Sequence, residues 1–102
     1  MENVNVIKIC EKVDNSFYTE INIIKYKGRV FRTKFHNSKE MVGEFNINSC
    51  VKILTDNGWV ILADRHEICP DLVIESFVTE DKLKEYANVF LNAAIKYIKM
   101  LY

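Results

Sequence analysis

The stretch KYKGRVFRTKFH, residues 25–36, decides how this chain folds, because it contains a turn between two expected strands. It surrounds Gly28 with basic side chains and aromatic rings, and it has no acidic residue. The residues on either side, 17–25 and 29–36, are rich in β-branched and aromatic side chains, so we expect an antiparallel strand pair. Successive side chains of a strand point to opposite faces, so the length of the turn determines which side chains share a face.

Two turns fit this pattern. A two-residue loop, Lys27-Gly28, pairs Ile24 with Phe31. A three-residue loop, residues 26–28 with Gly28 in the left-handed conformation, pairs Ile23 with Phe31 instead. We predict the three-residue loop because it separates apolar from polar side chains better. Its apolar face holds Phe17, Ile21, Ile23, Phe31 and Phe35. Its opposite face holds Tyr18, Glu20, Asn22, Arg32, Lys34 and His36.

The polar face of this hairpin is the predicted binding surface. Proteins that bind single-stranded nucleic acid need exposed rings beside their cations, and here Phe31 and Phe35 are expected in the core. A protein partner with an acidic patch is therefore the first prediction, and nucleic acid bound through the same cations is the alternative. The predicted partner-binding residues are Lys25, Lys27, Arg32, Lys34, His36 and Tyr18.

Charge is unevenly distributed along the chain. Residues 25–39 contain six basic residues and no acid, a charge of +6. Residues 40–81 contain nine acids against two basic residues, a charge of −7. The two blocks suggest docking to a charged partner or head-to-tail contact between copies, unless folding interleaves them.

Further elements are expected on both sides of the hairpin. Residues 4–12 predict a strand whose apolar residues change phase, which indicates a bulge or burial on both faces. Residues 49–57 fit a short helix slightly better than half of a hairpin with TDNG (residues 55–58) as its loop. Residues 59–63 are apolar on both faces and predict a central strand. We expect Trp59 of this strand and Phe31 of the hairpin to be core anchors. Weaker strand patterns cover residues 41–47 and 72–78.

A long helix is predicted at the C-terminal end of the sequence. Thr79 is its expected N-cap, and apolar residues recur at helical spacing from Leu83 onward. On a helical wheel the apolar arc spans about 240°, wider than the roughly 100° that packing on one sheet requires. We therefore expect a homodimer, or contact with a partner, through this helix, unless other parts of the chain cover its flanks. The predicted contact residues are Val89, Ala93, Met100 and Ile95.

No motif predicts catalysis, a metal or a cofactor. His66 and Cys69 supply half of a tetrahedral site at most, and no signature of a nucleophile surrounds any cysteine. The three glycines lie in separate segments and form no phosphate-binding loop. An enzyme without a recognisable motif is the third reading. No signal peptide or membrane span is recognisable, and the three cysteines form no paired spacing, which indicates the cytoplasm.

Residues 1–102 are thus predicted to form one α+β domain. Its expected architecture is a four- to five-stranded, mostly antiparallel sheet, a long C-terminal helix on one face and a short helix near residues 49–57. Asparagine, isoleucine and lysine account for 33 residues, a composition typical of AT-rich coding sequence. In size, composition, α+β pattern and absence of catalytic motifs, the chain resembles small phage proteins that block host defence systems, such as anti-CRISPR proteins. This resemblance implies a non-enzymatic inhibitor that binds a host macromolecule in the cytoplasm of an infected cell.

Overall fold

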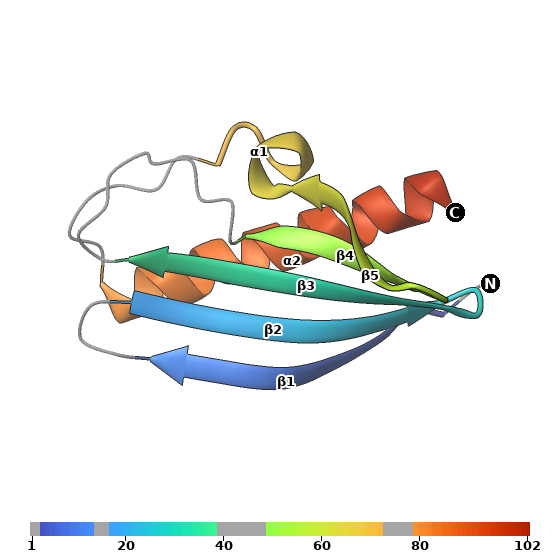
Figure 1. Ribbon diagram of the computed structural model, residues 1–102. Helices are drawn as coiled ribbons and strands as arrows, with labels where there is room; N and C mark the ends of the chain where they lie inside the picture. Colours follow the sequence, from blue (N-terminus) through green and yellow to red (C-terminus); the bar gives the residue numbers. More distant parts are fainter. Residues whose placement is uncertain (1–2, 14–16, 39–48, 73–78) are drawn as a thin grey trace.

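The described part of the chain forms a five-stranded antiparallel sheet with a long helix on one face, an α+β fold (Figure 1). A computed structural model describes residues 3–13, 17–38, 49–72 and 79–102. The strands pair in chain order, each with its neighbours in sequence. The elements are β1 (Asn5–Val13), β2 (Phe17–Tyr26), β3 (Arg29–Ser38), β4 (Cys50–Thr55), β5 (Gly58–Asp64), α1 (Arg65–Ile68) and α2 (Glu80–Leu101).

The turn between β2 and β3 corrects the predicted register. Tyr26 pairs with Arg29 and Ile24 with Phe31, so the loop has two residues rather than three. Lys27 and Gly28 both have positive φ, 51° and 75°. This is the geometry of a type I′ turn, whose twist matches that of the flanking strands, and Lys27 adopts it despite its side chain. The strand pair was predicted correctly, but the register was wrong.

The shifted register changes which side of β2 is buried. Tyr18, Ile24 and Tyr26 are buried, together with the polar Glu20 and Asn22. We call this side of the sheet the inner face. From β3 and β4 it receives Phe31, Thr33, Phe35, Asn37 and Val51, all of them buried.

Helix α2 covers the inner face and completes the core. Thr79 is its N-cap and accepts a hydrogen bond from the Lys82 backbone N–H, as predicted. The Phe90 ring lies 6.0 Å from the Phe35 ring, which fixes the helix over β3. The buried stripe of the helix is Leu83, Ala87, Phe90, Ala94 and Ile98.

The buried Glu20 is held by an ion-pair network along β1. Lys8 Nζ lies 3.0 Å from Glu20 Oε1 and 3.0 Å from Glu11 Oε2. The hydrogen bond to Glu20 is the largest cause that raises the pKa of Lys8, and the hydrogen bond to Glu11 is the next largest. The hydrogen bond from Lys8 in turn lowers the pKa of Glu11. Tyr18 donates a longer hydrogen bond, 3.4 Å, to Glu20. Glu20 therefore has partners at a buried position where an unpaired charge would be costly.

Two further expectations for the strands are settled. In β1 the register shifts between Lys8 and Cys10, so the phase change marks a bulge, and most of the strand is exposed. Residues 50–64 form the hairpin of β4 and β5 rather than a helix near 49–57, with Asp56-Asn57 as the loop. The short helix is α1, which Asp64 begins with a capping box to Glu67. The predicted strand at 41–47 lies outside the described residues, as do residues 73–78 of the other.

Candidate functional site

The side of the sheet opposite α2, which we call the outer face, carries the candidate site. None of the described helices lies over it (Figure 1). One row of paired residues crosses all five strands: Ile7, Ile23, Arg32, Lys52 and Ile61. The centre of this row is basic and both ends are aliphatic.

The basic centre, which we call the basic ridge, consists of Arg32, Lys34 and Lys52 on β3 and β4. All three are half-buried, as is common for long basic side chains whose stems lie along a surface while the charged ends reach water. The Arg32 guanidinium lies 5.0 Å from the centroid of the Trp59 ring, a cation–π contact. No described Asp or Glu of β1–β4 lies on the outer face. Asp64, at the end of β5, uses its carboxylate to cap α1.

Apolar side chains flank the basic ridge on both sides. Ile21 and Ile23 of β2 are half-buried, and Ile7 of β1 is exposed. On the other side, Trp59 is 37% exposed and Ile61 is 62% exposed, with Leu54 beside them on β4. Exposed apolar side chains gathered around buried cation stems are typical of a binding surface rather than of a solvated sheet.

His36 lies on the outer face at the end of the basic ridge. Its Nδ1 is hydrogen-bonded to Thr19 Oγ1 at 2.6 Å, and its ring centroid lies 5.5 Å from that of Phe17. The Ser49 hydroxyl accepts a hydrogen bond from the His36 N–H and donates one to its C=O. Burial, with a smaller contribution from Lys34, lowers the pKa of His36. Both effects favour the neutral ring over the charged one, which reduces the contribution of His36 to the positive charge of the basic ridge.

The other predicted binding residues lie in three places. Lys25 is exposed and lies on the outer face by its alternation along β2. Lys27 is in the turn, where its Nζ donates a hydrogen bond to the Tyr102 carbonyl oxygen. Tyr18 is only 1% exposed, on the inner face, so the predicted exposure of its ring is wrong. The incorrect register had placed its ring on the polar face that also holds Arg32.

Sequence reasoning missed Lys52, Leu54, Trp59 and Ile61 as members of the outer face. It also placed Ile21 and Ile23 on the opposite, apolar face, whereas they pair with Lys34 and Arg32 on the outer face. Trp59 was predicted in the core of a central strand, but β5 is at the edge of the sheet and the ring is partly exposed. The sequence signal that could have found them is the loop TDNG, residues 55–58. If this loop is taken as the turn of a hairpin, alternation along the second strand places Trp59 and Ile61 on one face.

The predicted contact residues of α2 divide into two groups. Val89 and Met100 are exposed, at 45% and 77%, whereas Ala93 and Ile95 are half-buried. Helix α1 packs near Ala93, where Ile68, Tyr97 and Met100 line a hollow of about 320 Å³. Part of this flank is thus covered by the same chain. The homodimer or partner contact through α2 stays a prediction.

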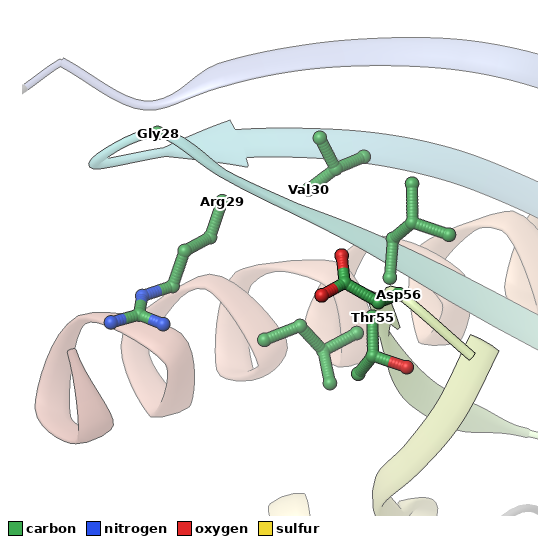
Figure 2. Close-up of a pocket in the computed structure, with 7 residues that line it drawn as sticks. Gly28, Arg29, Val30, Thr55 and Asp56 are labelled. Carbon is green, nitrogen blue, oxygen red and sulfur yellow. The ribbon is translucent and has the colours of Figure 1, made fainter. Parts of the chain in front are cut away.

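A larger hollow of about 510 Å³ lies between the tips of the two hairpins (Figure 2). It opens where β3 and β4 stop pairing beyond Phe31 and Ile53, and residues 28–30 and 53–56 line it. Arg29 and Asp56 come to it from different hairpins. With one cation and one carboxylate in its lining, the hollow does not extend the positive charge of the basic ridge.

Other chemistry has little support in the described part of the chain. No group of three or more His, Cys, Asp or Glu residues there is arranged to hold a metal ion. Burial raises the pKa of the Cys69 thiol, against the opposing effect of Arg65, and this disfavours the reactive thiolate. Among the helices described, none is long and apolar enough to cross a membrane. Comparison with protein-family models, curated proteins and solved structures finds no match to this chain.

Proposed function

We propose that this chain is a non-enzymatic protein-interaction module whose outer face binds an acidic, partly apolar surface of a protein partner. One observation carries the proposal: on the described part of the outer face, a cationic centre that no Asp or Glu of β1–β4 faces lies between two apolar flanks. Cations at this centre would steer and orient an acidic partner, and burial of the flanks would supply most of the affinity.

Nucleic acid is the second candidate, favoured by the same cations and by the exposed edge of Trp59. Its support is smaller, because most of the exposed side chains beside the basic ridge are aliphatic and offer no ring for a base. The Trp59 ring is also already in contact with Arg32. Aliphatic side chains around the contact of Arg32 with Trp59 match the composition of protein interfaces better.

An inhibitory role agrees with this mode of binding. A small domain that covers an acidic surface of a host macromolecule would inhibit by occupying it, as the resemblance to phage anti-defence proteins implies. We place this activity in the cytoplasm, where the free thiols of Cys10, Cys50 and Cys69 would stay reduced.

Reversal of charge on the basic ridge tests the proposal. In the double variant Arg32→Glu, Lys34→Glu we expect the unfolding free energy to change by no more than about 0.5 kcal/mol, because both half-buried side chains lie on the outer face rather than in the core. Partner affinity should fall at least tenfold and its salt dependence should weaken. The matched control is Lys96→Glu, Lys99→Glu on the exposed side of α2, which makes the same change in net charge.

The measurement is affinity capture from host lysate with each immobilised variant, followed by titration of the retained protein at several salt concentrations. Equal binding by both double variants would contradict the proposed face. Nuclease treatment of the lysate separates the two candidates, since a captured component lost on treatment would indicate nucleic acid.

A further inference from the structure

Strand β5 forms one edge of the sheet and pairs only with β4 among the described strands. An edge strand presents unpaired N–H and C=O groups, and proteins usually protect such edges with charges, prolines or bulges. The other edge, β1, is protected in this way, by a bulge next to Lys8 and by Glu11 and Lys12 along its length.

β5 lacks this protection over its first half. Residues 58–63 carry no charge, and the register with β4 is regular from Gly58 to Ile61. Three consecutive large side chains are exposed there: Trp59 at 37%, Val60 at 47% and Ile61 at 62%. Because Val60 faces the side of the sheet that α2 covers, its exposure indicates that the helix does not extend over this edge. The edge is therefore apolar on both faces.

The distribution of charge distinguishes the ways in which two copies of the chain could associate. If two copies packed through their outer faces, their basic ridges would face each other, and like charges in contact weaken association. Two copies joined through residues 58–62 of β5 bring together only uncharged residues over that length, and each ridge stays at least one strand away from the junction. We propose that β5 pairs antiparallel with β5 of a second copy. This inference does not depend on the proposed partner of the outer face.

The turn determines the register of this pairing. Thr55 and Gly58 flank a two-residue loop and form a hydrogen-bonded pair, so the alternation of pairs makes Val60 bond to Ile53 as well. The backbone groups of Trp59 and Ile61 then point to the free edge. A two-fold axis at Val60 would let Trp59 bond to Ile61 of the second copy, with the two Val60 residues as a close, non-hydrogen-bonded pair.

Sedimentation equilibrium tests the pairing against the alternative interface on α2. We expect the native chain to dimerise at tens of micromolar, roughly as for interfaces below about 1,200 Å². Ile61→Lys should raise the dimer Kd about tenfold or more, because it places two cations near the axis. The controls are Ile9→Lys on the β1 edge and Met100→Lys on α2, both at exposed positions, and neither should change the Kd.

A second variant tests the register independently of the charge. Val60→Cys should form a covalent dimer under mild oxidation, because Cα atoms of such a pair lie about 4.5 Å apart, within disulfide range. Val89→Cys on α2 is the control and should react no faster than the native cysteines. A native chain that stays monomeric at about 100 μM, where weak interfaces still assemble, would overturn the inference. Weakening by Met100→Lys but not by Ile61→Lys would assign the dimer to α2 instead.

Discussion

Two large rings of the same sheet, Phe31 and Trp59, should differ sharply in their contribution to stability. Phe31 is 0% exposed and its ring packs on Tyr102, whereas Trp59 is 37% exposed on the edge strand. Phe31→Ala should cost about 3–5 kcal/mol, the range for a buried ring. Trp59→Ala should cost about 1 kcal/mol, the centre of the range for ordinary substitutions. Urea denaturation of both variants measures the difference, and equal losses would contradict the burial of Phe31.

The ring of His36 should stay neutral throughout the physiological range. Its pKa is lowered by burial first and by Lys34 second, from the ordinary value of about 6.5. A lowered histidine pKa means that the unfolded chain binds the proton more readily. The associated stability is therefore fully present above about pH 6.5, and it is lost as the pH falls from that value through the lowered pKa of the folded state.

NMR titration of the His36 ring protons measures this pKa directly. Lys34→Gln should raise the pKa only in part, because burial is the larger cause. A native pKa at or above about 6.5, the value of an unperturbed histidine, would show that the ring is accessible and would return its charge to the basic ridge.

Single residues also show why the strand faces were assigned incorrectly. Glu20 and Asn22 suggested a solvent-facing side of β2, yet both are buried. Glu20 is tolerated there because Lys8, on another strand, reaches its carboxylate. The ion pair between Lys8 and Glu20 could not be predicted from the alternation of side chains within residues 17–25 alone. The placement of Arg32 and Lys34 on the face opposite Phe31 and Phe35 was predicted correctly, because these residues alternate in either register.

At the scale of elements, we expect two substitutions in the β2–β3 turn to differ in their effect on stability. A Cβ atom on Gly28 would meet no atom within 4 Å, so only the backbone strain at φ 75° opposes a side chain. Gly28→Ala should therefore destabilise the protein by about 1 kcal/mol. Lys27→Gly should relieve the same strain at φ 51°, offset by the lost hydrogen bond to Tyr102.

Thermal unfolding of the two variants provides the measurement. We expect a lower midpoint for Gly28→Ala and an unchanged or higher midpoint for Lys27→Gly. A matching loss in both variants would argue against a type I′ turn, because that turn requires positive φ at both positions.

Residues 49–57 were predicted as a helix because the pattern of a single element was ambiguous. Cys50, Val51, Ile53 and Leu54 fit both a helical stripe and a short strand, so their spacing alone could not decide. The decision comes from β3, whose Thr33 and Phe31 pair with Val51 and Ile53. Helix α2 was predicted almost to its ends because its cap and its apolar spacing are both local signals.

At the scale of the whole molecule, the sequence predicted the α+β fold but not the order of its strands. The apolar run at 59–63 is as compatible with a central strand as with an unprotected edge, and only the pairing of all five strands distinguishes them. The outer face depends on that order, because Trp59 and Ile61 join the basic ridge only through β4. This is why half of the candidate site was not predicted.

The consecutive order of the strands has a kinetic consequence. Each ladder closes between neighbours in sequence, so hairpins can form with little loss of chain entropy, starting at the two-residue turns. Helix α2 must instead return across β2 and β3 from the far end of the chain. We therefore expect low contact order within the sheet and late docking of the helix. Until it docks, Phe31 and Phe35 face water, and this transient species is the stage of folding most exposed to aggregation.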